Sequence, residues 1–329
     1  MSRREILRGL RGACRRLLGR TGARTWIAVA LASLVVHVNA APAIPRISSE
    51  WWQIAGSPDL GELGQRQQQP VDFALWQAAD GTWQLWSCVR NTREPGRTRL
   101  FYRWEGARLT DPDWRPMGIA MHADLAIGET AGGLQAPFVV RTGGRFLMFY
   151  GDWANIRSQE SSDGKTFVRR PAVDGSPHFG RDAESNTRDP MVLRVGDEWL
   201  CYYTANPEKR GRVFVRASKD LRTWGAEREV AGPGVAPRDL RYSAECPFVV
   251  EPAAGEFYLF YTQIYGARAH TTVRYSRDPL DFAAEDKVVA ELPIAAPELV
   301  RFNGEWFIAA LRGDLKGIQV ARLVWDRPK

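Results

Sequence analysis

The sequence predicts an all-β fold made of five repeated units, and two observations support this prediction. First, a short motif recurs five times in the 329 residues: one residue, usually followed by Pro, and then two apolar residues. Second, short aromatic and β-branched runs alternate with Gly, Asp and Asn turns, and no long stretch has a helical period. The leading residues of the five copies, called the frame residues below, are Asp72, Ala136, Asp189, Cys246 and Ala296. Repeats spaced by 64, 53, 57 and 50 residues indicate a propeller or a solenoid.

The first 40 residues carry the net charge of the chain. They hold eight of the 45 Lys and Arg residues and one of the 38 acidic residues, so 37 of each remain in the body. A neutral body gives no electrostatic basis for binding nucleic acid. The 13 Trp residues suit a β-rich fold, a carbohydrate-binding surface, or both.

Residues 1–40 are predicted to be a secretory signal peptide. A basic stretch precedes the apolar run 26–36, and small residues follow at 38–40. The run is shorter than the about 20 residues of a membrane span, so we expect export to the periplasm or the medium without lasting membrane association. Arg3 and Arg4 fit either a twin-arginine export motif or an ordinary basic leader.

Cysteine usage leaves the question of disulfides open. Cys14 lies in the leader, and Cys88, Cys201 and Cys246 remain. Three cysteines without metal-ligand spacing define no disulfide framework. One disulfide, or three buried free thiols, would both fit the sequence.

The strands are predicted in order along the chain. Residues 44–70 form a lead-in segment, and residues 71–329 form the repeated domain. The first strands of the repeats are expected at 71–76, 138–141, 191–194, 248–250 and 299–302. The hairpin turns that follow them are expected at 80–81, 143–144, 196–197, 254–255 and 303–304. The second strands are expected at 83–89, 146–150, 199–204, 257–262 and 306–311, and third strands at 99–104, 212–217, 272–275 and 318–325. Asn-Gly and Asp-Gly turns between such runs are strong hairpin signals.

The ends of three repeats also resemble each other. Segments 161–167, 218–224 and 276–282 share Ser, Asp and a final aromatic residue, which we interpret as the turn into the outer strand of each unit. Five units of three to four antiparallel strands predict a single-domain five-bladed β-propeller. A β-sandwich is the alternative, but it gives no reason for five repeats.

Acidic residues occupy only some of the equivalent positions. In a propeller the first strand of each blade lines the central channel, so the frame residues should converge at one mouth. Asp72 and Asp189 are frame residues, and Glu245 precedes the frame residue Cys246. Converging carboxylates differ in proton affinity because like charges disfavour joint ionisation. Two carboxylates on opposite sides of a glycosidic bond are the machinery that hydrolyses it.

These residues resemble those of the five-bladed propeller glycoside hydrolases, the superfamily of families 43, 62, 32, 68 and 117, over residues 65–326. Family 43 comprises arabinanases, α-L-arabinofuranosidases and β-xylosidases. The resemblance implies that Asp72 is the general base, Asp189 the modulator of proton affinity, and Glu245 the general acid of an inverting reaction.

Two motifs are also similar to family 32, the invertases and fructanases. Arg188-Asp189-Pro190 and Glu245-Cys246-Pro247 match its Arg-Asp-Pro and Glu-Cys-Pro signatures. That resemblance implies a retaining mechanism with Asp72 as nucleophile. Blade one departs from both families: it lacks the Asn-Asp-Pro-Asn-Gly of family 32 and the Pro that family 43 commonly places after its Asp.

Further residues are expected near the channel mouth. The candidates for binding sugar hydroxyls or stacking on a sugar ring are Gln135, Arg188, Asn186, Trp76, Trp153, Asp152 and Arg312. Their structural alternatives are core packing, satisfied hydrogen bonds and, for Arg188, an ion pair with Asp189. Glu298 is expected to point elsewhere. The histidines show no ligand spacing, so we expect no catalytic metal or cofactor; a structural ion in the channel stays open.

The sequence therefore predicts an exported glycoside hydrolase that acts on a furanoside or xyloside in plant or microbial oligo- or polysaccharides. The alternatives are a retaining β-fructofuranosidase, a non-catalytic carbohydrate-binding propeller, and a phosphorylase. A phosphorylase needs several basic residues around a phosphate, and only Arg188 is placed for this by the sequence. The sugar, the linkage, exo or endo action and the oligomeric state do not follow from the sequence.

Overall fold

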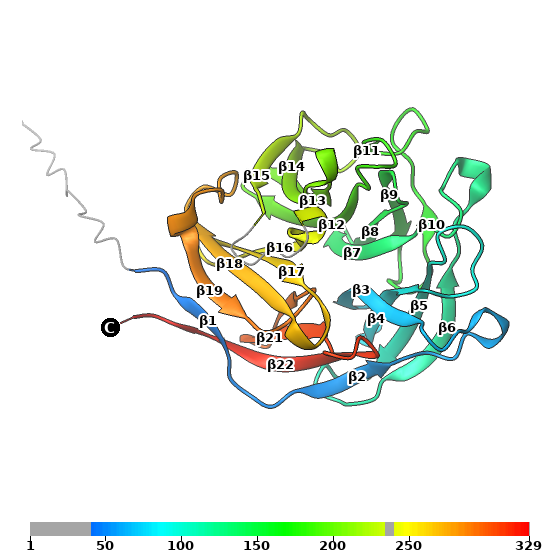
Figure 1. Ribbon diagram of the computed structural model, residues 1–329, viewed down its shortest axis with the longest axis horizontal. Helices are drawn as coiled ribbons and strands as arrows, with labels where there is room; N and C mark the ends of the chain where they lie inside the picture. Colours follow the sequence, from blue (N-terminus) through cyan, green and yellow to red (C-terminus); the bar gives the residue numbers. More distant parts are fainter. Residues whose placement is uncertain (1–40, 234–239, 329) are drawn as a thin grey trace, which may run out of the picture. The chain divides into compact units, whose positions relative to one another are not determined.

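The computed structural model of the protein describes residues 41–233 and 240–328, so the predicted signal peptide lies outside the described residues. Five antiparallel sheets of four or five strands surround a central axis (Figure 1). The prediction of an all-β, five-bladed propeller is confirmed. The helices in the described ranges are short 3₁₀ turns, and none is long and apolar enough to cross a membrane.

Four blades follow the same order from the axis outward. Blade one is β3 (Gln69–Gln77), β4 (Trp83–Arg90), β5 (Leu100–Gly106) and β6 (Arg115–Met121). Blade two is β7 (Gln135–Thr142), β8 (Arg145–Gly151), β9 (Asn155–Ser161) and β10 (Val168–Arg169), with β11 (Phe179–Gly180) also paired to β9. Blade three is β12 (Arg188–Val195), β13 (Glu198–Ala205), β14 (Arg212–Ser218) and β15 (Arg228–Ala231). Blade four is β16 (Glu245–Ala253), β17 (Glu256–Ile264), β18 (His270–Ser276) and β19 (Val288–Leu292).

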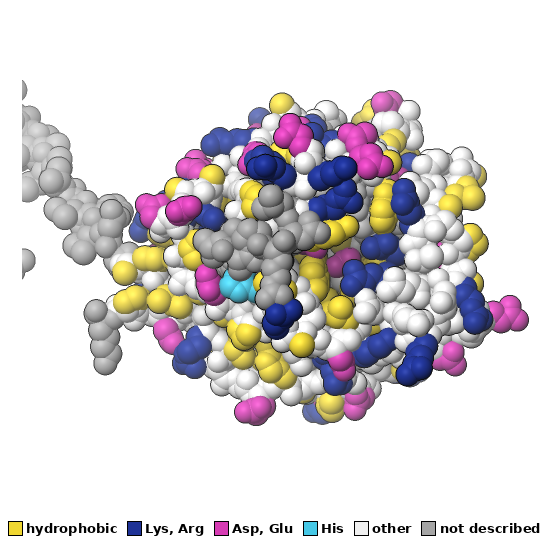
Figure 2. Space-filling model, in the orientation of Figure 1, with side chains coloured by type: hydrophobic (Ala, Val, Ile, Leu, Met, Phe, Trp, Pro, Cys, Tyr) yellow, Lys and Arg dark blue, Asp and Glu magenta, His cyan; other side chains and the backbone are white. Residues whose placement is uncertain are grey.

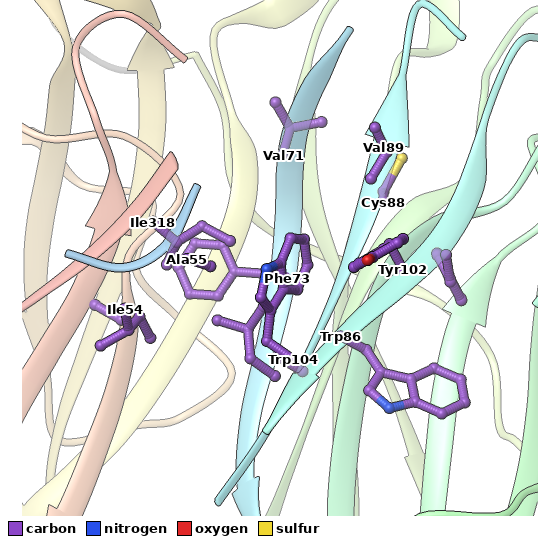
Figure 3. Close-up of a cluster of buried hydrophobic side chains, with 14 of the residues drawn as sticks. Ile54, Ala55, Val71, Phe73, Trp86, Cys88, Val89, Tyr102, Trp104 and Ile318 are labelled. Atoms are coloured by element: carbon purple, nitrogen blue, oxygen red, sulfur yellow. The ribbon is translucent and has the colours of Figure 1, made fainter. Parts of the chain in front are cut away.

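Blade five joins the two ends of the described chain. Its inner strands are β20 (Glu298–Phe302), β21 (Glu305–Leu311) and β22 (Gly317–Asp326). β1 (Ile44–Ile47) and β2 (Trp52–Gly56) both pair antiparallel with β22. The predicted lead-in, residues 44–70, thus contributes the outer strands of blade five. Ile54 of β2 is fully buried beside Phe73 of blade one and Ile318 of β22 (Figure 3), so this closure also packs against blade one.

Two of the five predicted turns have positive φ at both central residues. Gly143 and Gly144 have φ of 56° and 75°, and Asn303 and Gly304 have φ of 50° and 83°, as type I′ hairpins need. The repeated Ser-x-Asp element forms the turn after the third strand. In blade two, for example, Asp163 Oδ1 accepts hydrogen bonds from the backbone amides of residues 165 and 166, each at 2.8 Å.

The core lies between neighbouring blades, so the inner strands are buried on both faces. In β4, every residue but the last is buried, which explains why this strand appears in the sequence as a continuous run rather than an alternating one.

The frame residues lie at one face of the propeller, the face at which the first strand of each blade begins. The second strand of each blade runs back to this face, so the loops between second and third strands surround the centre of the face.

Candidate active site

The frame residues share an unusual backbone conformation. Asp72, Ala136, Asp189, Cys246 and Ala296 have φ of 42°, 43°, 56°, 50° and 49°. In the first four blades the pairing with the second strand also shifts register at this point. The frame residues of blades one to four therefore sit at β-bulges in their first strands, and Ala296 shares their left-handed conformation just before β20. Bulges re-aim side chains, and here all five frame residues line one cavity.

Asp72 reaches this cavity half-buried. The Cys246 thiol lies 3.5 Å from Asp72 Oδ1 and donates to it. The same sulfur lies 3.2 Å from the Tyr265 hydroxyl. Asp72, Cys246 and Tyr265 thus form a connected polar group from blades one and four. All three cysteines of the described residues are unpaired thiols.

Glu245 is held by Arg188. Arg188 Nε donates to Glu245 Oε1 at 3.2 Å, and its Nη2 contacts the same oxygen. Arg188 is 3% exposed and also donates to the backbone oxygen of Asn186 at 2.8 Å. Burial raises the pKa of Glu245 above its usual range, the Arg188 charge opposes the rise, and Asp72 adds to it.

Asp189 is buried with one oxygen unpartnered. Its Oδ2 accepts from the backbone amide of Cys246 at 2.9 Å and lies 3.7 Å from Arg188 Nε. Its Oδ1 has no hydrogen-bond partner among the described residues. Burial raises the pKa of Asp189 to about 7; Arg188 opposes this rise, whereas Asp72 and Glu245 reinforce it. Three neighbouring carboxyl groups thus differ in environment, as acid–base chemistry requires.

A fourth carboxyl group lines the same cavity. Glu298 was expected to point elsewhere, yet it contacts the cavity formed by the frame residues. It follows the frame residue Ala296 by two positions, and side chains two apart lie on one face of a strand. Burial raises the pKa of Glu298 well above its usual range.

Two of the predicted sugar-binding residues have side-chain amide oxygens that accept no hydrogen bond in the described structure. Gln135 is buried next to the frame residue Ala136, and its Oε1 has no partner in the described structure. Asn186 has φ of 46°, and its Oδ1 is likewise buried and unpartnered. Both positions agree with their predicted location near the acids.

Three other predicted binding residues are engaged in structural contacts. Trp76 is buried at the other end of β3, where its ring lies 6.1 Å from that of Trp86 and its Nε1 donates to Gly164 O. Asp152 is fully buried in an ion pair with Arg157. Arg312 binds Gln53 and Asp314 on blade five. The expectation that these side chains contact a sugar is therefore wrong for Trp76 and Asp152, and Arg312 is engaged by Gln53 and Asp314.

Tyr265 and the arginines near Trp153 were missed by the sequence analysis. Tyr265 follows β17, and Trp153 follows β8, so both belong to loops between second and third strands. That shared place in the repeat is the signal that would have selected Tyr265. Within residues 41–233 and 240–328, no group of three or more His, Cys, Asp and Glu side chains is arranged to hold a metal ion.

Solved structures with a similar arrangement are glycoside hydrolases. A thermostable family-43 glycoside hydrolase is 16% identical with a TM-score of 0.56, covering 80% of this chain and 90% of its own. An endo-arabinase from Bacteroides thetaiotaomicron is 12% identical with a TM-score of 0.58, covering 79% and 94%. A family-32 β-fructofuranosidase from Bombyx mori is 16% identical with a TM-score of 0.57, covering 85% and 63%. The chain shares their five-bladed propeller fold.

A comparison with the sequences of curated proteins finds one short match to this chain. A sucrose-6-phosphate hydrolase from Salmonella typhimurium is 39% identical over 64 residues, which span 19% of this chain and 14% of that protein. A comparison with models of protein families finds none that matches. At the identities found, the structural likeness establishes the fold, and the activity has to be argued from the site.

Proposed function

We propose that the protein is a glycoside hydrolase in which Asp72, Asp189 and Glu245 carry the chemistry. The observation that supports this most is that Asp72 and Asp189 line one cavity, while Glu245, beside the lining residue Cys246, shares Arg188 with Asp189. The fold likeness to glycoside hydrolases agrees with it. The substrate is a furanoside or xyloside of an oligo- or polysaccharide.

Glu245 is the general acid in this proposal. A general acid must keep a proton at the working pH, and burial raises the pKa of Glu245 in that direction. In the structure Glu245 is bound to Arg188, which favours the charged form. The contact therefore stabilises the carboxylate that remains once Glu245 has given its proton to the leaving group, and a sugar hydroxyl that draws Arg188 away favours the protonated acid.

Asp72 is the general base of an inverting reaction. One of its oxygens accepts from the Cys246 thiol, which fixes the carboxylate while leaving the other oxygen for water. Asp189 is the modulator: its position next to Arg188 and to the backbone of residue 246 ties its protonation state to that of Glu245. No step requires a metal or a cofactor.

A retaining β-fructofuranosidase is the second candidate. The Arg-Asp-Pro and Glu-Cys-Pro motifs at 188–190 and 245–247 favour it, as does the short match to a sucrose-6-phosphate hydrolase. The two candidates differ in product stereochemistry, because carboxyl groups about 6.5–9.5 Å apart leave room for water whereas about 5–5.5 Å favours direct attack. Proton NMR of the first anomer released separates them.

We also propose that the protein is exported after removal of residues 1–40. The basic and apolar pattern of this segment supports the proposal. N-terminal sequencing of the protein recovered from a periplasmic or culture fraction tests it. Residues near 41 as the mature N-terminus are expected, and an intact N-terminus in the cytoplasmic fraction would contradict it.

The hydrolytic function is tested with a panel of aryl glycosides. The panel holds α-L-arabinofuranoside, β-D-xyloside, β-D-fructofuranoside, α-L-fucoside and β-D-galactofuranoside. We expect the wild type to hydrolyse one of them and Asp72→Asn to lose about 10²–10⁴-fold of kcat/KM, the typical contribution of a general base. Asn tolerates the left-handed backbone at this position, so the variant should fold.

Asp197→Asn is the matched control. Asp197 is exposed in the hairpin at the opposite end of blade three, so its removal should leave kcat/KM unchanged. If none of the aryl glycosides is hydrolysed and a sugar nevertheless binds measurably, a non-catalytic carbohydrate-binding propeller is favoured instead.

A further inference from the structure

Two arginines are held against one tryptophan at the face that carries the acids. The loop between β4 and β5 contains Arg97 and Arg99, and the loop between β8 and β9 contains Trp153. The guanidinium carbons of Arg97 and Arg99 lie 4.4 and 4.9 Å from the centre of the Trp153 ring. Cation–π stacking of this kind fixes the orientation of a guanidinium group. Two positive charges are therefore held in place beside a single ring.

No carboxylate neutralises these two charges. Neither Arg97 nor Arg99 has an ion-pair partner among residues 41–233 and 240–328, and the acids of the adjoining segments are used elsewhere. Glu94 pairs with His122, Glu129 with Arg169, and Asp152 with Arg157. Arg99 Nε is buried and has no hydrogen-bond acceptor in the described structure. Like charges held together are unfavourable, and an unpaired buried donor costs about 1–3 kcal/mol, so the arrangement is incomplete without an anion.

The loop that carries the two arginines is locked by its backbone to the loop that precedes β7. Arg97 N donates to Ala131 O at 2.9 Å, and Arg99 N donates to Gly132 O at 3.0 Å. A side chain at Gly96 or Gly132 would collide with the backbone of the opposite loop. The close approach is therefore available only with glycine at these positions, and it gives both arginines a rigid base.

Unusual backbone conformations occur at the same place. Thr98, between the two arginines, has φ of 62°, and Trp153 has φ of 84°. A β-branched residue rarely adopts a positive φ, and each such residue costs about 1–3 kcal/mol. Conformations of this kind cluster at ligand sites because the surrounding contacts hold them there. Here they place Arg97, Arg99 and Trp153 in one group.

This group adjoins the carboxylates through β4. Cys88 of β4 pairs with Val71, the residue before Asp72. Burial raises the pKa of the Cys88 thiol, Arg99 and Arg90 oppose this rise, and Asp72 adds to it. Arg99 precedes Leu100, which pairs with Val89, the residue after Cys88. Basic side chains gather beside the hollow at the centre of the face seen in Figure 2.

We propose that Arg97, Arg99 and Trp153 form an oxyanion subsite next to Asp72, and that the substrate is a saccharide bearing a phosphate, sulfate or carboxylate group. The identity of the substrate rests on the proposed hydrolase function. The binding of an anion by this subsite does not depend on that function. Guanidinium groups bind such oxyanions through paired charge-assisted hydrogen bonds. Because two guanidinium groups already stack on Trp153, its role is to hold the arginines rather than to stack on a sugar ring. Free inorganic phosphate has the same chemistry and is the second source of the anion.

Anion binding is measured first, without turnover. Isothermal titration of inorganic phosphate, inorganic sulfate and glucuronate is compared for the wild type, Arg99→Gln, Arg97→Gln and Arg301→Gln. Arg301 is the matched control: it stacks on Trp306 at 5.9 Å and lies toward the end of β20, away from the acids. Arg97 is exposed, so its variant folds even if Arg99→Gln does not. We expect at least one anion to bind the wild type and Arg301→Gln equally and to bind the other two variants about tenfold more weakly or worse.

Kinetics then identify the source of the anion. Aryl glycosides of the active sugar are compared with and without the anionic group that binds in the titration (phosphate, sulfate or carboxylate), placed on a carbon other than the anomeric one. The charged glycoside should have at least about tenfold higher kcat/KM in the wild type but not in Arg97→Gln. Release of a sugar 1-phosphate from the neutral glycoside in phosphate buffer would instead identify free phosphate as the ligand and overturn the substrate proposal. Absence of binding of every anion to the wild type, or equal binding by all four proteins, would overturn the subsite. Anion binding without any hydrolysis supports the subsite and counts against the proposed hydrolase.

Discussion

At the residue scale, Asp189 is held where its charge is unfavourable. It is buried, one of its oxygens has no partner, and two other carboxyl groups lie nearby. Arg188 offsets part of this, but it is shared with Glu245. Such a residue lowers the stability of the fold and is retained where function requires it. Replacement of Asp189 by an uncharged residue should therefore lower the activity and raise the free energy of unfolding.

Asp189→Asn is predicted to stabilise the protein in a pH-dependent way. The folded pKa of about 7 lies above the ordinary value of 3.8, so protonation favours the folded state. The stability from Asp189 is complete below pH 3.8 and is lost as the pH rises towards 7. Asn has no charge to lose. We expect the free energy of unfolding of Asp189→Asn, relative to the wild type, to rise by about 2–4 kcal/mol between pH 4 and pH 7.5, measured by urea denaturation.

The exposed Asp197→Asn serves as the control and should show a difference from the wild type that does not vary with pH. A stability difference between Asp189→Asn and the wild type that is equally constant across this range would mean that Asp189 is not protonated near pH 7 in the folded protein. Activity should fall in Asp189→Asn at all pH values.

The acids could be predicted from the sequence because they occupy repeated positions. Asp72 and Asp189 are frame residues of a motif whose copies can be aligned, Glu245 precedes another, and the five frame residues line the cavity. Single side chains outside the register could not be predicted in the same way. Whether Asp152 faces a ligand or Arg157 depends on a contact that sequence spacing does not reveal. The same holds for Arg99, because its contact with Trp153 is visible only in the folded structure.

At the element scale, the β-bulge of the first strands is the device that builds the site. A regular strand would place alternate residues along the channel, whereas the left-handed frame residue turns the chain inward at the mouth. Three blades use Ala or Cys there, although such a residue is less favourable than Gly in this conformation by about 1–2 kcal/mol. The motif therefore combines a strained residue with a following Pro in four of the five blades.

Substitutions at Ala136 test the bulge. Ala136 has φ of 43° and carries no proposed chemistry. Ala136→Gly should leave the free energy of unfolding unchanged or raise it by up to about 1 kcal/mol. Ala136→Val should lower it by about 2 kcal/mol, because β-branched residues are poorly tolerated at positive φ. Equal stability of the two variants, measured by thermal denaturation, would contradict the left-handed conformation.

The hairpins and the Ser-x-Asp turns were predictable because local chemistry determines them. Asn303-Gly304 and Gly143-Gly144 adopt the expected positive φ values. The strands β1 and β2 were not predicted. They are short, β1 contains Pro45, and no hairpin joins them, since both pair with β22 instead of with each other. Their partner lies more than 260 residues away in the chain, and local sequence carries no record of it.

At the scale of the whole molecule, a fivefold scaffold carries an uneven set of side chains. Five equivalent left-handed frame residues line one cavity, but only those of blades one and three are acidic, while Glu245 of blade four precedes its frame residue and blade five adds Glu298. The ring is closed by strands from both ends of the described chain, which keeps blades one and five at a fixed separation. Chemistry at the centre therefore depends on the complete ring rather than on any single blade.

The most direct test of this account is a leaving-group series with Glu245→Gln. Aryl glycosides of the active sugar with leaving groups of decreasing acidity are compared with a natural disaccharide, for the wild type and the variant. A general acid matters only when the leaving group needs a proton. We predict that Glu245→Gln hydrolyses the most acidic aryl glycoside nearly as well as the wild type and loses about 10²–10⁴-fold on the disaccharide. A loss of the same size on every substrate, or none on the disaccharide, would contradict Glu245 as the acid of a propeller glycoside hydrolase.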